Sequence, residues 1–186
     1  YLEKILQATV DLPTIPRDMI LRQTTSAIDS AVSGIPEPGP FDGQSWPDVL
    51  AEIVLPLIRN MRDVRRYAAS IQGTVTSLKG QVALVDVLAL EAVRLFLPEV
   101  FRHMHQAIPG LTTPSSVTFE SRSDAPELKA QVDDVIESGG VHVNVVRAMI
   151  ERLFPAAKRH INNTHYGYEW QAQWLRQRRV AHVDIL

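Results

Sequence analysis

A group of arginines between residues 59 and 66 has the clearest chemical potential in this sequence. The segment reads Arg59-Asn60-Met61-Arg62-Asp63-Val64-Arg65-Arg66. If it is helical, Arg62 and Arg66 lie on one face, away from the apolar positions Val64, Ala68 and Ile71. A guanidinium group is planar and can bind phosphate oxygens through two parallel hydrogen bonds, so this helix start is suited to grip a phosphate. The alternative is a solvated face with a local ion pair between Asp63 and Arg66.

A second basic cluster, Arg176 and Arg178-Arg179, follows Trp170 and Trp174. Mixed arginine and aromatic side chains can bind single-stranded nucleic acid. A packed helix with a basic outer face is the more common arrangement, however. The formal net charge of -2 and the pI of about 6.3 give no bulk electrostatic attraction toward nucleic acid or an anionic membrane. We therefore do not favour a nucleic-acid partner.

The chain lacks the usual motifs of phosphate loops and serine hydrolases. Neither G-x-x-x-x-G-K-[ST] nor G-x-G-x-x-G occurs, and there is no G-x-S-x-G nucleophile elbow. Adjacent residues on a helix do not face each other, so Asp133-Asp134 reads as a solvated face rather than a metal site. The absence of cysteine excludes disulfides and thiolate ligands. We predict no catalytic residue in this chain.

The six histidines offer little support for a metal centre. His103 and His105 are two residues apart, which on a helix places them on nearly opposite sides. His160 and His165 flank a turn-rich segment and could be brought together, but ordinary boundary histidines are the more frequent outcome. The sequence therefore predicts no metal site.

The elements that must position these residues are predominantly helical. Apolar residues at Val64, Ala68, Ile71, Val75 and Leu78 recur at steps of three and four, which is typical of an amphipathic helix. Proline and glycine mark the boundaries: Pro16 and Pro98 open helices, Pro56 kinks or divides one, and Gly80 ends one. Similar reasoning gives helices over 16–32, 46–60, 84–107, 126–136, 141–153 and 168–179, and loops over 33–47, 109–124 and 162–167. The prediction is an all-α, irregular helical bundle, with a short strand near residues 8–12.

Both ends of the sequence look cut. The first residue is Tyr1, in the middle of an apolar-periodic run, and the last residues, 180–186, have no helix cap or polar tail. The longest apolar run, 82–97, is interrupted by Asp86, Glu91 and Arg94 and so does not predict a membrane-spanning helix. We expect a soluble, cytoplasmic piece of a larger protein.

Four short segments stand in order along the chain and are more specific together than singly. They are YLEKILQ at 1–7 with Leu12-Pro13, MRDVRRY at 61–67, VDVLALEAVRLF at 85–96 with PEVF at 98–101, and RRVAH at 178–182. Together they resemble the KAP family of P-loop NTPases, which reads YLEKI-Q…LP, PRD-KR, VDLLALEALRLF-PEVY and RRICHPDYF. Here Met61 and Val183 replace prolines of the family, and Phe101 replaces a tyrosine.

The resemblance implies that the chain follows the Walker A and Walker B motifs and is mostly the helical lid of the NTPase. It implies a division into 1–33, the end of the NTPase core and first lid helix; 34–47, a Gly/Pro-rich loop; 48–108, the lid; and 109–186, a helical extension. In such enzymes the core binds ATP and Mg²⁺, and the lid can present arginines to the phosphates. Arg62 is then the candidate lid arginine, with Arg65 and Arg66 behind it. Some bacterial members take part in defence against phage.

Two functions therefore remain open at the level of sequence. In the first, these helices close over ATP, or sense ATP, bound by a core of the same protein. In the second, they form an interaction or oligomerisation module, because the apolar density of residues 84–104 exceeds what one face of a helix needs to bury internally. A stand-alone helical enzyme is disfavoured, since it would need a pocket built from scattered histidines and carboxylates.

Overall fold

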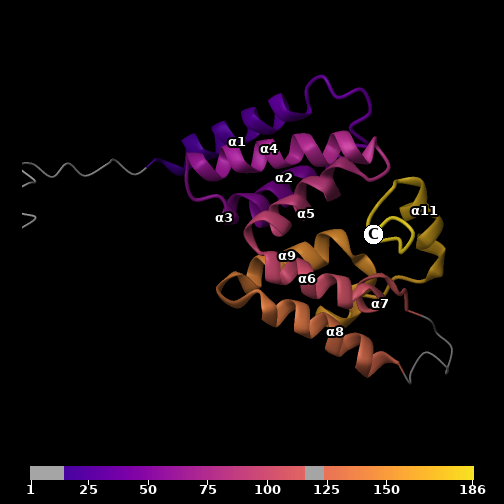
Figure 1. Ribbon diagram of the computed structural model, residues 1–186. Coiled ribbons are helices and arrows are strands. Elements are labelled where there is room, and N and C mark those ends of the chain that lie inside the picture. Colours follow the sequence, from indigo (N-terminus) through magenta and orange to yellow (C-terminus); the bar gives the residue numbers. More distant parts are fainter. Residues whose placement is uncertain (1–14, 116–123) are drawn as a thin grey trace, which may run out of the picture.

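The computed structural model describes residues 15–115 and 124–186, and these residues form an all-α, irregular helical bundle (Figure 1). Within these ranges there is no strand. The helix end predicted at 1–6 and the strand predicted at 8–12 lie outside the described residues. Nor does the described part contain a helix that is both long enough and apolar enough to cross a membrane.

Helix α4 (Met61–Leu78) confirms the clearest periodic pattern of the sequence. Its start is fixed by Asn60, whose Oδ1 accepts hydrogen bonds from the amides of Arg62 (2.9 Å) and Asp63 (3.1 Å). Its end is fixed by Lys79, which takes a left-handed conformation (φ 47°) before Gly80. Helix α1 (Arg17–Val32) packs along α4, and both helices begin at the same end of the molecule (Figure 1).

The segment around Pro56 stays helical by widening one turn. It consists of α2 (Trp46–Val49), a π-helical turn η2 (Leu50–Val54) and α3 (Leu55–Leu57). The amide of Leu55 bonds to the carbonyl of Leu50, five residues back. Proline has no N–H and its ring collides with the carbonyl four residues earlier, so the π turn relieves the crowding that was expected to kink the helix.

Helix α5 (Leu84–Phe96) runs through the centre of the bundle, and α6 (Pro98–Gln106) follows after the bend predicted at Pro98. Nine of the residues of α5 are buried, because α4, η2 and α6 pack around it. The hydroxyl of Tyr67 reaches from α4 to donate to the carbonyl of Leu88 at 2.6 Å. The apolar density of this region is therefore used inside the fold.

The second half of the chain corrects two expectations. Residues 108–112, partly assigned to a loop, form the short helix α7 (Ile108–Thr112), which crosses α8 (Ala125–Ser138) so closely that a Cβ on Gly110 would lie 2.7 Å from the carbonyl of Leu128. Val141, the first residue of the helix predicted over 141–153, was expected on the apolar face of that helix but is 95% exposed. The left-handed Gly140 (φ 52°) and the 3₁₀ turn η4 (Gly140–His142) change the helical phase before α9 (Val143–Leu153) begins.

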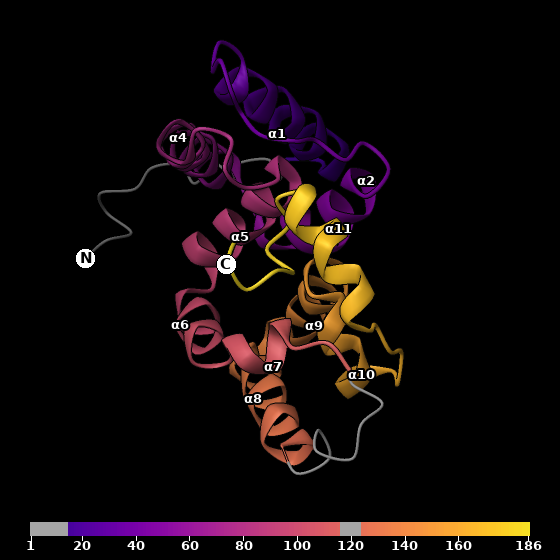
Figure 2. The same cartoon turned by 90° about the vertical axis from the view of Figure 1, so that its right-hand side faces the viewer.

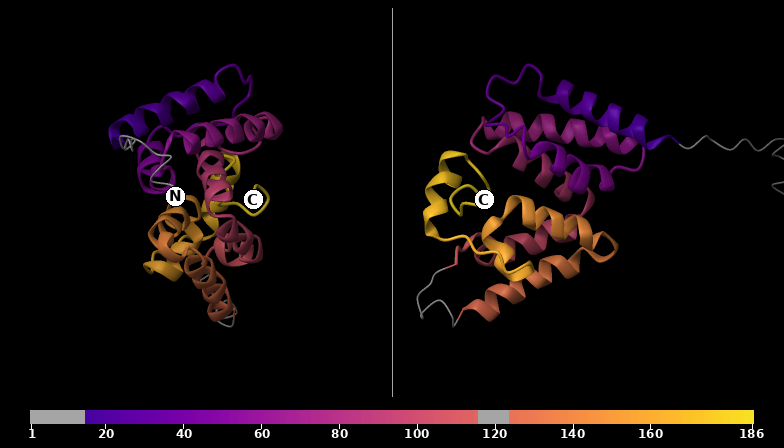
Figure 3. Two further views of the ribbon diagram at one scale, coloured as in Figure 1. Left: turned by 60° about the vertical axis from the view of Figure 1, so that its left-hand side comes forward. Right: turned by 180° about the vertical axis from the view of Figure 1, so that it is seen from behind.

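The last part of the chain returns to the first layer. After η5 (Pro155–Ala157), α10 (Lys158–Ile161) and η6 (Tyr168–Trp170), helix α11 (Gln171–Arg176) ends earlier than predicted. Arg178 then takes a left-handed conformation (φ 56°), and the terminal residues run back beside α5 (Figure 2). Viewed from behind, this segment flanks both the α1–α4 layer and the α6–α9 layer (Figure 3).

A buried ion pair fixes this return. Asp86 of α5 is fully buried, and Arg179 donates from Nε to its two carboxylate oxygens at 2.9 and 2.7 Å. The amide of Val180 donates to the same carboxylate at 2.9 Å, and Nη2 of Arg179 bonds to the carbonyl of Arg152 at 3.0 Å. Burial raises the pKa of Asp86, and the attraction of Arg179 only partly opposes it. Arg179 thus points inward, contrary to the basic outer face expected of its cluster.

Removing Asp86 should strongly destabilise the fold. Asp86→Ala leaves the Arg179 guanidinium without its carboxylate in a largely buried position, so we expect the free energy of unfolding to fall by about 3–5 kcal/mol. Asp18→Ala is the matched control, because it removes an exposed ion pair with Arg22 and should cost less than about 1 kcal/mol. Urea denaturation followed by circular dichroism measures both. Equal losses in the two variants would contradict the assignment of Asp86 as the anchor of the tail.

Candidate functional site

The three arginines predicted as phosphate ligands lie at the start of α4 and are all exposed. The expected ion pair between Asp63 and Arg66 is not formed: Asp63 instead accepts a hydrogen bond from the amide of Arg59 at 3.1 Å. The guanidinium group of Arg66 lies over the ring of Phe96, 5.8 Å from its centroid. Arg66 therefore already makes a cation–π contact within the fold. The ion pairs of the described residues involve other arginines, which leaves Arg62 and Arg65 without a carboxylate partner there.

A cleft of about 540 Å³ opens at the same end of the molecule, between the start of α1 and the end of α3. Arg17 and Arg59 line it, and both are exposed. Its remaining wall is mostly apolar and consists of Ile15, Asp18, Ile20, Leu21, Ala51, Leu55, Pro56 and Ile58. Arg17 was not predicted as a functional residue from the sequence, and Arg59 was predicted only as part of the arginine cluster at 59–66. Their proximity is set by tertiary packing of α1 on α3 and α4.

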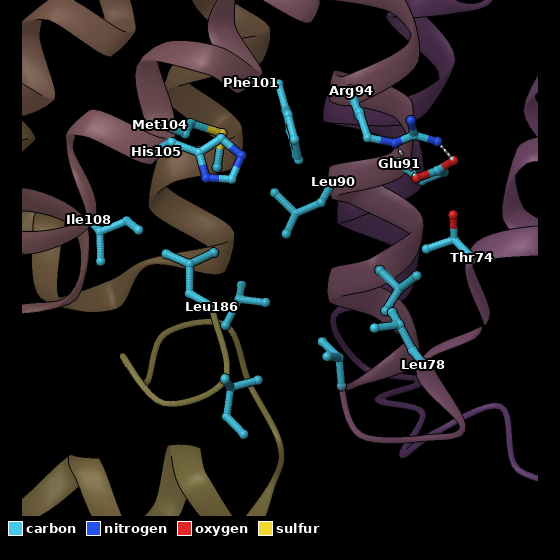
Figure 4. Close-up of a pocket in the computed structure, with 14 residues that line it drawn as sticks. Thr74, Leu78, Leu90, Glu91, Arg94, Phe101, Met104, His105, Ile108 and Leu186 are labelled. Atoms are coloured by element: carbon cyan, nitrogen blue, oxygen red, sulfur yellow. Dashed lines mark hydrogen bonds and ion pairs between the residues drawn. The ribbon is translucent and has the colours of Figure 1, made fainter. Parts of the chain in front are cut away.

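A second cavity, of about 210 Å³, lies between α4, α5, α6 and the C-terminal tail (Figure 4). Its wall is largely aliphatic and aromatic, with contributions from Leu90, Phe101 and Leu186. The few polar groups are Thr74 and the Glu91–Arg94 pair on one side and His105 on the other, where the imidazole packs edge-on against Phe101. Four separate segments build this cavity, so no local pattern in the sequence predicts it.

Glu91 is bound too tightly to serve as a general base in this cavity. It is 3% exposed, and its carboxylate accepts hydrogen bonds from Ser70 and from Arg94 Nε (2.9 Å) and Nη2 (2.5 Å). Burial alone would raise the pKa of Glu91, but the hydrogen bonds from Arg94 and Ser70 bring it below its usual value. The carboxylate of Glu91 is therefore ionised and held by its partners, which does not suit it to act as a general base.

The histidines take structural positions. Nδ1 of His103 lies 2.6 Å from a carboxylate oxygen of Asp134, which links α6 to α8. His160 accepts a hydrogen bond from Nε of Arg159 at 2.9 Å. His165 lies across the loop from His160, with its Nε2 3.1 Å from Oδ1 of Asn163. No group of three or more metal-ligating side chains converges within residues 15–115 and 124–186.

Comparison with known proteins adds no assignment. No protein-family model, no curated protein and no solved structure matches this chain. The function must therefore be argued from the residues and their arrangement.

The environment of His160 predicts a pH dependence of stability. Burial and the nearby cations Arg159 and Lys129 lower the pKa of His160 to about 4. An unfolded histidine has a pKa near 6.5, so between about pH 6.5 and 4 the unfolded chain binds a proton that the folded chain does not, and stability falls as pH falls. His160→Gln keeps an acceptor for Arg159 and should remove about 1 kcal/mol of this loss. This figure is reduced because solvent screens the partly exposed ring.

Urea denaturation of both proteins at pH 7 and pH 4.5 measures this difference. Identical losses of stability in the native chain and in His160→Gln would show that His160 is not the titrating group.

Proposed function

We propose that this chain is the helical lid or regulatory region of a P-loop ATPase similar to the KAP family, in which it closes over or senses ATP and Mg²⁺ bound by a core outside the chain. The observation that carries this proposal is the composition of one end of the molecule. There, the exposed apolar side chains of Ile15, just before α1, and of Met19 and Leu21 in α1 lie at the same end as arginines that have no carboxylate partner in the described residues.

An ATPase core packed against this end would satisfy both kinds of side chain. It would cover the apolar residues of α1 and the wall of the 540 Å³ cleft. It would also bring the phosphates toward Arg62 and Arg59, whose charges are otherwise balanced only by solvent. Arg62 is the better candidate for a phosphate ligand because Asn60 caps its backbone amide and so fixes the helix start from which its side chain extends.

The segments that carry the resemblance also interact with one another in the fold. Asp86, from the third segment, is paired with Arg179, from the fourth. Glu91 and Arg94, both in the third segment, bond to each other and to Ser70, just after the second. The direct pairing of Asp86 with Arg179 joins two of the matched segments and supports the resemblance. From the same resemblance, we propose that the protein acts in the cytoplasm and takes part in the defence of a bacterium against phage.

The alternative is an interaction or oligomerisation module with no direct nucleotide role. Its original motivation, the apolar density of residues 84–104, is weakened because α5 is buried within the bundle. What still favours it is the apolar cleft at the start of α1, which a partner or a second copy would cover as well as a core would. Light scattering tests the second copy: a monomer at all protein concentrations would contradict self-association through this cleft.

Substitution of Arg62 tests the lid role. In the protein that includes the proposed core, Arg62→Ala should lower kcat for Mg·ATP hydrolysis by about tenfold or more, because a positive charge is lost where negative charge develops in the transition state. Arg147→Ala is the matched control: Arg147 is exposed on α9 and lines neither the cleft at the start of α1 nor the apolar cavity, so its loss should leave hydrolysis unchanged. ATP turnover equal to that of the native protein in Arg62→Ala would eliminate the role assigned to this residue.

A further inference from the structure

A third cleft lies at the opposite end of α4 from Arg62. It has a volume of about 410 Å³ and is lined by Glu37, Pro38, Gly39, Pro40, Gly80, Arg176 and Arg178. These residues come from three segments that are distant in sequence: the loop after α1, the turn after α4 and the end of α11. Because α4 has 18 residues at 1.5 Å each, the cleft is about 27 Å from the arginines at its start. It is therefore a separate site.

Two guanidinium groups give this cleft a positive charge. Arg176 and Arg178 are both exposed, and neither forms an ion pair among the described residues. Arg178 is held at the rim, because its Nη1 donates to the carbonyl of Gly80. An arginine has five N–H donors, so most of those of Arg178 remain for a ligand. The one carboxylate in the wall, Glu37, is exposed and bonds to neither arginine.

The backbone around the cleft takes left-handed conformations at successive points. Gly39 has φ 104°, Gly80 has φ 72° and Arg178 has φ 56°. A Cβ on Gly39 would lie 2.3 Å from the carbonyl of Val82, so the close approach of these segments requires glycine there. A Cβ on Gly80 would make a tight contact of 3.1 Å with the carbonyl of Glu37. Gly80 is buried, and within the described residues its amide N–H has no acceptor.

We propose that this cleft binds the phosphate group of a small phosphorylated ligand. Two arginine side chains line the cleft, and Gly80, whose backbone N–H has no acceptor in the described residues, lines it as well. A phosphate bound there could accept hydrogen bonds from the guanidinium groups and from this N–H. The left-handed Arg178 is a strained residue of the kind that collects at ligand sites, where the strain positions a side chain. At about 410 Å³, the cleft has room for the rest of a small molecule as well as for its phosphate.

The first experiment compares phosphate binding in two arginine variants. Inorganic phosphate and AMP are titrated into ¹⁵N-labelled protein at low ionic strength, and the Gly80 amide and the arginine Nε resonances are followed. Arg176→Gln should weaken binding by about tenfold or more, since one charged contact is lost, whereas Arg147→Gln should bind as the native chain does. AMP binding more tightly than phosphate identifies a phosphorylated small molecule as the ligand. Equal binding in both variants, or an unperturbed Gly80 amide, overturns the proposal.

A pair of glycine variants provides the second test. Gly80→Ala and Gly34→Ala both place a Cβ on a left-handed residue, with φ 72° and 86°, so they carry similar backbone strain. Only the Cβ at Gly80 enters the cleft; the one at Gly34 has no atom within 4 Å. Loss of phosphate binding in Gly80→Ala alone supports the site, and retention in both overturns it. If Gly80→Ala does not fold, the comparison of Arg176→Gln with Arg147→Gln decides whether the cleft binds phosphate.

This inference is independent of the proposed lid role. Arg62→Ala should bind phosphate at the cleft as the native chain does. If Arg62→Ala and Arg176→Gln lowered phosphate binding equally, the anion would not be specific to the cleft. That result would overturn the assignment of the cleft as the phosphate site.

Discussion

The buried carboxylate of Asp86 is the constraint from which much of the remaining architecture follows. A carboxylate without exposure to water must be compensated by donors, and here Arg179 and the amide of Val180 supply them. These donors belong to a tail more than ninety positions away in sequence. Satisfying Asp86 therefore forces the end of the chain back against α5, and it does so at one register only.

The position of the tail builds part of the wall of both the apolar cavity and the basic cleft. Val180, Ile185 and Leu186 form one wall of the apolar cavity because Arg179 is fixed beside α5. On the other side of Arg179, the left-handed Arg178 is directed to the carbonyl of Gly80 and so to the rim of the basic cleft. The Asp86–Arg179 pair thus lies between the apolar cavity and the basic cleft, which are only a few residues apart along the tail.

The sequence was most informative where local physics decides the structure. The apolar stripe of α4, the new helix at Pro98 and the break at Gly139-Gly140 depend on side-chain period and backbone propensity, and all were predicted. Val141 was misplaced because a left-handed glycine changes the helical phase without altering the pattern of apolar letters. The inward direction of Arg179 was not predicted. Its partner, Asp86, was interpreted only as a charged interruption of the apolar run at 82–97, because the sequence does not show which cation pairs with it. The arginines of α4 were found by type and spacing, but the clefts depend on segments that meet only in three dimensions.

The two ends of α4 are mechanically connected under the proposed function. Tyr67 and Ser70 tie the middle of α4 to α5 through hydrogen bonds to Leu88 and Glu91, so α4 and α5 would move as one body. Asp86 ties the tail to that same body, and Arg178 ties the tail to the end of α4 at Gly80. A movement of the Arg62 end toward bound ATP would therefore carry the basic cleft with it. The amide of Leu84, at the start of α5, donates to the carbonyl of Pro40 at 2.8 Å. The loop that contains Gly39 would therefore move with α5 or be strained by its movement. An anion holding Arg176 and Arg178 would restrain this body, which gives the cleft a physical route to influence lid position.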